Sequence, residues 1–83
     1  MKIRFFANLR ELLGTDELDF ADDNFPSTVA ELRAQLRTAG DEEFAAAMAD
    51  PNVLCAVNQR VADDAVSVEA GDEVAFFPPM TGG

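Results

Sequence analysis

Residues 73–83 read EVAFFPPMTGG, and this C-terminal stretch decides which fold we expect. Val74 and Phe76 occupy alternate positions of the segment 73–77, which is the period of two of a half-buried β-strand. The two prolines that follow fix φ and favour an extended, directed segment, and two glycines end the chain. The sequence therefore predicts a last strand that leads into a C-terminal Gly-Gly tail over about residues 78–83, flexible at its tip.

The Gly82-Gly83 ending suggests that the C-terminal carboxylate takes part in a reaction. Glycine has no Cβ, so this pair can enter a channel too narrow for other residues and bring the Gly83 carboxylate to a reactive partner. The alternative is that two terminal glycines are simply frayed chain, as most termini are. The stiff arm formed by the two prolines favours insertion over fraying.

The beginning of the chain carries the same alternation as its end. Residues 2–7 alternate apolar and charged residues, and Phe6 falls on the charged face. Residues 17–20 alternate again, so the two segments predict a hairpin. Residues 8–13 between them predict a short helical turn that stops at Gly14.

The middle of the chain is expected to be helical. Thr28 followed three residues later by Glu31 is the pattern of a capping box, which opens a helix that we expect to end at Gly40. Asp41 can cap a second, weaker helix that must stop before Pro51.

The last third returns to strands at residues 53–57, 66–68 and 73–77, with a turn at residues 58–60 after the first of them. The order ββαβββ predicts an α+β fold of the β-grasp, ubiquitin-like type, with a mixed sheet of four to five strands packed on one main helix plus short helices. A chain of 83 residues gives a single domain over residues 1–83. The expected core is formed by apolar residues of these elements: Ile3, Phe5, Leu18, Phe20, Val29, Leu32, Leu36, Val57, Val74 and Phe76.

Two phenylalanines fall outside this core. Phe6 and Phe77 lie on the charged faces of the first and last predicted strands, and in a β-grasp sheet these strands are neighbours. We expect the two rings to form an exposed docking patch for a partner at the base of the tail. The alternative is that the turn at residues 8–13 folds back and covers one of them.

The charge of the chain limits its partners. Sixteen acidic and six basic residues give a net charge of −10 and a pI near 4.1, which disfavours nucleic acid. An acidic surface favours a basic partner, but solubility or adaptation to a salty cytoplasm explains the same charge. No stretch has the pattern of a signal peptide or a membrane span, so we expect a cytoplasmic protein.

The chain has little catalytic equipment. It contains no His, Tyr or Trp, and its one cysteine, Cys55, lies in a predicted strand where a buried, unreactive thiol is expected. Neither a metal site nor a phosphate-binding glycine motif is evident, so we expect no cofactor on this chain and no catalysis by the chain alone.

Several segments together resemble one family. Residues 5–7, 10–12, 14–16 and 56–59, and above all residues 71–83, are similar to the small subunit of molybdopterin synthase, MoaD, of the MoaD/ThiS family of sulfur carriers with a ubiquitin-like fold. The similarity spans nearly the whole chain. Within the tail only Met80 departs from the family pattern, which tends to have a branched aliphatic residue there.

The resemblance implies a sulfur-carrier cycle. An E1-like activating enzyme (MoeB-like) would use ATP to adenylate Gly83, and a sulfur donor protein would convert the adenylate to a thiocarboxylate. The tail, with Pro79, Met80, Thr81 and Gly82, would insert into the large subunit (MoaE-like). There the thiocarboxylate would give its sulfur to cyclic pyranopterin monophosphate during molybdenum cofactor biosynthesis. The catalytic side chains would belong to that partner.

Three other functions stay open from the residues. One is a ThiS-like carrier for the thiazole of thiamine or for another pathway. Another is a ubiquitin-like modifier whose Gly83 forms isopeptide bonds with lysines of target proteins. The third is a regulatory interaction domain that uses Phe6 and Phe77 and does not need the glycines.

Overall fold

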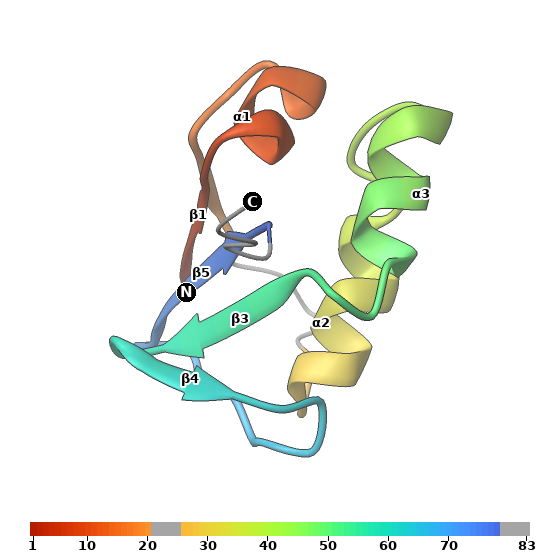
Figure 1. The fold of residues 1–83 in the computed structure, drawn as a ribbon. Helices are drawn as coiled ribbons and strands as arrows, with labels where there is room; N and C mark the ends of the chain where they lie inside the picture. Colours follow the sequence, from red (N-terminus) through yellow and green to blue (C-terminus); the bar gives the residue numbers. More distant parts are fainter. Residues whose placement is uncertain (21–25, 79–83) are drawn as a thin grey trace.

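A computed structural model describes residues 1–20 and 26–78 of the chain (Figure 1). The sequence Asp22-Asp23-Asn24 is typical of a polar turn, and this segment lies outside the described residues. Along the chain the elements are β1 (Lys2–Phe5), α1 (Asn8–Leu13), β2 (Glu17–Asp19), α2 (Val29–Leu36), α3 (Glu42–Ala49), β3 (Leu54–Val57), β4 (Arg60–Ala62) and β5 (Glu73–Phe77).

The strands form one mixed sheet in the order β2-β1-β5-β3-β4. β1 and β5 pair in parallel at its centre, and the remaining pairs are antiparallel. Helices α2 and α3 lie next to each other on one side of the sheet (Figure 1). The predicted α+β fold of β-grasp type, with a hairpin at its start, is confirmed. Because β5 fills the central position, the last strand of the chain completes the sheet.

Helix α2 begins at the predicted capping box. The Glu31 N–H donates to the Thr28 hydroxyl (3.3 Å), and the Thr28 N–H donates to the Glu31 carboxylate (3.2 Å). The helix ends at Leu36 and not at Gly40 as predicted, because Thr38 turns back and donates both its N–H and its hydroxyl to the Gln35 carbonyl. Gly40 serves packing, since a Cβ there would lie 2.9 Å from Phe44.

The other two helices, α1 and α3, follow the sequence prediction. α1 ends at Gly14, which has the left-handed φ of 85° that favours glycine. α3 is capped by Asp41, whose carboxylate accepts from the Phe44 N–H at 3.0 Å, and it ends before Pro51.

The fourth strand differs from the prediction. We expected a turn at residues 58–60 and a strand at residues 66–68. Instead Asn58 and Gln59 alone form the turn, both at positive φ, and Arg60 already begins β4. Positive φ at two central residues matches the right-handed twist of a tight hairpin. Residues 66–68 contribute only an isolated bridge between Ser67 and Thr28.

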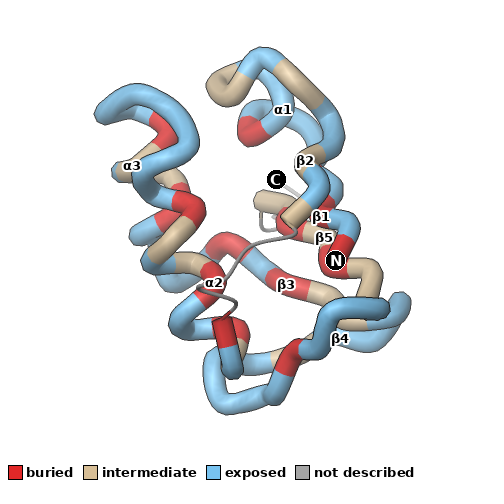
Figure 2. The backbone as a smooth tube through the Cα atoms, turned by 180° about the vertical axis from the view of Figure 1, so that it is seen from behind, coloured by how far each residue is buried: buried red, intermediate tan, exposed pale blue. Residues whose placement is uncertain are grey.

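The core lies between the helices and one face of the sheet. Buried positions recur along α2, α3, β3 and β5 (Figure 2). The Phe5 ring meets Phe44 edge to face at 5.6 Å and stacks on Phe76 at 6.0 Å. Seven of the predicted core residues are buried: Ile3, Phe5, Val29, Leu32, Leu36, Val74 and Phe76. Leu18, Phe20 and Val57 are only partly buried against them.

Candidate functional site

Strand β5, which leads into the tail, is held on both of its edges. Phe76 lies opposite Phe5 of β1, and Phe77 lies opposite Leu54 of β3. The Phe6 N–H donates to the Phe76 carbonyl at 3.2 Å, just beyond the end of β1. The chain therefore leaves the sheet from its centre, at a point fixed by two neighbouring strands.

The predicted tail residues lie beyond that point. Pro79, Met80, Thr81, Gly82 and Gly83 are outside the described residues, so their roles in insertion and reaction stay predictions.

The sheet face opposite the helices carries an apolar surface next to β5. Side chains alternate along a strand, and directly paired residues share a face, so the burial of Cys55 and Phe76 places their neighbours outside. Phe6 continues the same alternation beyond β1. We call this surface the outer patch, formed by Phe6, Leu54, Ala56, Val61, Ala75 and Phe77.

The two phenylalanines of the outer patch differ in exposure. Phe6 is 46% exposed, as predicted, whereas Phe77 is half-buried. β1 and β5 lie side by side as expected. α1 buries Leu9 in the core and contacts α3, so it does not act as a lid over Phe6. The docking role of the two rings stays a prediction.

Sequence reasoning missed the part of the outer patch that β3 and β4 contribute. Val61 is 74% exposed and Leu54 is 37% exposed. Register places Leu54 beside Phe77, and Val61 beside Ala56, which in turn faces Ala75. The signal was the alternation over residues 60–62, which is too short to distinguish a strand from a turn.

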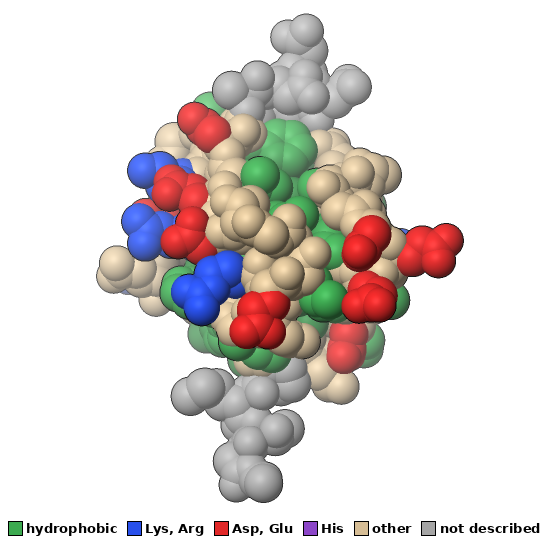
Figure 3. Space-filling view, turned by 90° about the horizontal axis from the view of Figure 1, so that it is seen from above, with side chains coloured by type: hydrophobic (Ala, Val, Ile, Leu, Met, Phe, Trp, Pro, Cys, Tyr) green, Lys and Arg blue, Asp and Glu red, His purple; other side chains and the backbone are tan. Residues whose placement is uncertain are grey.

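The other half of this sheet face is charged. Lys2 lies 3.2 Å from Glu17, and Arg4 lies 3.8 Å from Glu73. Seen from the end of the molecule, basic side chains gather on one side beside acidic ones (Figure 3). Such exposed pairs add little stability, about 0–1 kcal/mol each, so they divide the face into a polar and an apolar half without anchoring the fold.

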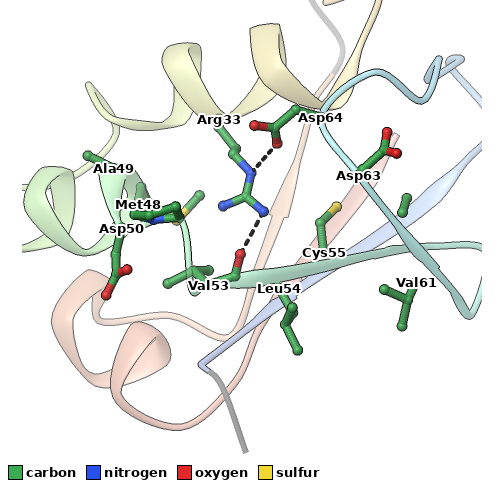
Figure 4. A pocket seen from close by; sticks show the side chains of 12 residues that line it. Arg33, Met48, Ala49, Asp50, Val53, Leu54, Cys55, Val61, Asp63 and Asp64 are labelled. Carbon is green, nitrogen blue, oxygen red and sulfur yellow. Dashed lines mark hydrogen bonds and ion pairs between the residues drawn. The ribbon is translucent and has the colours of Figure 1, made fainter.

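Arg33 connects helix α2 to the sheet behind the outer patch (Figure 4). Its Nη2 donates to the Val53 carbonyl at 2.6 Å, and its guanidinium lies 5.4 Å from the centre of the Phe76 ring. Its Nε lies 2.9 Å from the Asp64 carboxylate, close enough for an ion pair but without the geometry of a hydrogen bond. One side chain thus links α2, β5, the start of β3 and the loop after β4.

A pocket of about 380 Å³ opens beside Arg33. Leu54 and Val61 line it and also belong to the outer patch, so the hollow continues the apolar surface. The other lining residues labelled in Figure 4 are Arg33, Met48, Ala49, Asp50, Val53, Cys55, Asp63 and Asp64.

The Cys55 thiol is buried, as predicted. Burial raises its pKa to about 11, although the nearby Arg33 guanidinium acts in the opposite direction. The thiol is therefore protonated at neutral pH and is a poor nucleophile. Over residues 1–20 and 26–78, no three His, Cys, Asp or Glu side chains gather where they could hold a metal ion. None of the helices described in the structure is long and apolar enough to cross a membrane.

The strand order, the parallel central pair and the helices packed on one face define a β-grasp domain of the ubiquitin-like class. The chain belongs to the ThiS family, whose model matches residues 3–83. This confirms the family resemblance drawn from the sequence.

Individual relatives share the whole length of the chain. The molybdopterin synthase sulfur carrier subunit of Escherichia coli (strain K12) is 47% identical over 83 residues, which cover 100% of this chain and 99% of that protein. The crystal structure of SAMP1 from Haloferax volcanii has a TM-score of 0.79 at 27% identity and covers 100% of this chain and 98% of that one.

A further structure contains two chains. It is the complex of subunits 1 and 2 of the molybdopterin-converting factor from Helicobacter pylori, with a TM-score of 0.65 at 23% identity and coverage of 99% of this chain and 96% of that one. At this identity the likeness shows the fold alone.

Proposed function

We propose that this protein is the sulfur-carrier subunit of a molybdopterin synthase. The observation that carries the proposal is the 47% identity, over the whole of both chains, with the Escherichia coli protein of that name. The strand that precedes the reacting tail supports it, because β5 is held in the centre of the sheet.

In this proposal the reacting group is the Gly83 carboxylate. A carboxylate is a poor electrophile because its charge repels attack, so an E1-like enzyme uses ATP to convert it to an acyl adenylate with a good leaving group. A sulfur donor protein then replaces the adenylate to give a thiocarboxylate, which is an ionised sulfur nucleophile at neutral pH. The need for ATP agrees with the cytoplasmic location that we expect from the sequence.

The tail delivers the sulfur to cyclic pyranopterin monophosphate in the large subunit. Residues 79–82 enter that subunit behind Gly83. Removing or adding one residue would misplace the reacting carbon by about 3.5 Å, which is more than positioning for catalysis tolerates. Such variants should therefore lose transfer.

The outer patch is the surface that we assign to the large subunit. It surrounds the point where β5 leaves the sheet, and three of its apolar side chains are exposed. The net charge of −10 favours a partner with a basic surface. The two-subunit complex from Helicobacter pylori is a precedent for such pairing in a protein of the same fold.

The test is to incubate the purified chain with an E1-like activating enzyme, ATP and sulfide, and to locate sulfur by fragment mass spectrometry. Exchange of oxygen for sulfur changes the mass almost as oxidation of a methionine does, so only a fragment that isolates Gly83 decides the matter. Sulfur at Gly83 supports the proposal. An unmodified Gly83, beside a known carrier that is converted under the same conditions, would contradict it.

A second candidate is a protein modifier, because the fold also matches SAMP1, the small archaeal modifier protein 1 of Haloferax volcanii, with a TM-score of 0.79. It uses the same activation but ends in an isopeptide bond to a target lysine. Extracts that contain covalent conjugates of the chain, and lose them when Gly83 is deleted, would favour the modifier. A ThiS-like carrier for thiazole synthesis would load sulfur equally well but fail to form molybdopterin with the large subunit.

A further inference from the structure

The chain carries very few groups that can attack an activated carboxyl. Its sequence contains one lysine, Lys2, one cysteine, Cys55, and no His or Tyr. Cys55 is buried and its pKa is raised to about 11, so its thiolate is scarce and enclosed. Serine and threonine hydroxyls need a base, usually His, to become nucleophiles, and the chain has none.

The α-amino group is the second amine of the chain, and it is occupied. Met1 is buried, and its ammonium donates to the Phe20 carbonyl at 3.0 Å. The Phe20 N–H in turn donates to the Met1 carbonyl at 2.8 Å, and Asp19 lies 4.0 Å from the ammonium. This amine must break away from the edge of the sheet before it can react.

Lys2 is placed differently. It is the first residue of β1 on the outer face, its side chain is 52% exposed, and its Nζ forms a surface ion pair with Glu17 at 3.2 Å. An exposed pair of this kind opens at little cost.

We propose that Lys2 Nζ is the single acyl-acceptor site of this chain, and that it takes the activated Gly-Gly carboxyl of a second copy when no sulfur donor is present. The proposal rests on the adenylation of Gly83 proposed above. The lysine nitrogen attacks the acyl carbon, a C–N bond forms and the C–O bond to the phosphate breaks. AMP leaves with the electron pair, a proton passes to water, and the product is an amide.

The fold favours a second copy, and not the same chain, as the source of the activated carboxyl that reaches Lys2. β1 and β5 are parallel, and Lys2 lies opposite Glu73, at the start of β5. The tail leaves from the other end of β5, four residues and about 13 Å further on. The sequence has prolines at positions 78 and 79, and because proline restricts φ this pair disfavours a sharp return. One donor end and one acceptor per copy allow only unbranched products, open or closed into a ring, with one kind of linkage.

The first arm of the test needs no activating enzyme. The native chain is treated at pH 8 with a limiting amount of acetyl N-hydroxysuccinimide ester and mapped by mass spectrometry. In an unfolded chain the α-amino group is the weaker base and is acetylated first. We expect acetylation of Lys2 alone in the native chain and of Met1 in denaturant. Met1 acetylated as fast as Lys2 in the native chain would overturn the proposal.

The second arm uses an E1-like enzyme and ATP without a sulfur donor. Hydroxylamine in a parallel sample traps the activated end as a Gly83 hydroxamate and so reports activation separately. We expect a covalent dimer whose tryptic digest contains residues 1–4 joined through Lys2 to residues 61–83. Lys2→Arg, which keeps the charge, should abolish the dimer and leave the hydroxamate unchanged. Glu17→Gln, which opens the ion pair, should speed dimer formation several-fold.

The outcomes separate the two proposals. Hydroxamate without dimer in the native chain would overturn Lys2 as the acceptor and leave the carrier function intact. A dimer that persists in Lys2→Arg would do the same. Absence of the hydroxamate would contradict the proposed activation of Gly83, and the acetylation arm would still decide whether Lys2 is the reactive amine.

Discussion

Phe76 and Phe77 are neighbours in β5, yet their side chains lie on opposite faces of the sheet and have different surroundings. Phe76 is fully buried, stacked on Phe5 and covered by Arg33, whereas Phe77 is half-buried in the outer patch beside Leu54. Cys55 and Leu54 repeat the contrast on β3. Since alternation sends neighbours to opposite faces, one short strand both holds the fold and contributes to the outer patch, the surface proposed for a partner.

The largest effect should come from the inner face. Phe76→Ala removes a ring from the centre of the core and leaves Arg33 without its aromatic contact. We expect a loss of about 3–5 kcal/mol in the free energy of unfolding, a large part of the ~5–15 kcal/mol of a typical domain. Denaturant unfolding measures it. Phe77→Ala is the matched control, and equal losses in the two variants would break the comparison.

The buried thiol should make stability depend on pH. The pKa of Cys55 is raised from 9.0 to about 11 in the folded chain, so the unfolded chain releases this proton first as the pH rises. This contribution to stability is complete below pH 9 and is lost between about pH 9 and 11. Across that pH range, the free energy of unfolding should fall more steeply with pH in the native chain than in Cys55→Ala. Parallel curves would show that the thiol is not shielded.

The outer face should affect binding more than stability. Phe6→Ala and Phe77→Ala remove apolar area at the base of the tail, and anchors of this kind cost about 2 kcal/mol or more when truncated, or roughly 30-fold in Kd. Calorimetric titration with the large subunit measures the change. A large drop in Tm with unchanged Kd would place these rings in the core.

A smaller effect is expected at the margin of the outer patch. Val61→Asp puts a charge on the most exposed apolar residue of the patch and should weaken docking by about tenfold, or 1.4 kcal/mol, with little change in stability. Val66→Asp is the control, because Val66 is also exposed but lies outside the patch. Equal effects of the two variants would mean that charge, and not the patch, governs docking.

Features set by neighbouring residues could be predicted from the sequence. The Thr28–Glu31 capping box, the Asp41 cap and the alternation in β1 and β5 all depend on local spacing. β4 was missed because Asn58-Gln59 lacks the glycine that usually marks a two-residue turn.

Features set by register between distant strands could not be predicted in this way. Leu54 and Val61 join Phe77 only through the pairing of β3 with β5 and β4, which local patterns do not specify. The end of α2 was predicted at Gly40 because glycine commonly follows the last turn of a helix. In the structure α2 ends at Leu36, and the glycine at position 40 is required by close packing against Phe44 of α3. The reaction proposed for the tail rests on its prolines and glycines and on the family resemblance, and residues 79–83 lie outside the described residues.

The most direct test is a single turnover with a loaded chain. The chain carrying a Gly83 thiocarboxylate is mixed with the large subunit and cyclic pyranopterin monophosphate, and molybdopterin and residual thiocarboxylate are measured together. We predict that molybdopterin forms while the thiocarboxylate returns to carboxylate, and that Phe77→Ala slows both changes equally. A loaded chain that binds the large subunit and keeps its sulfur would contradict the proposed function.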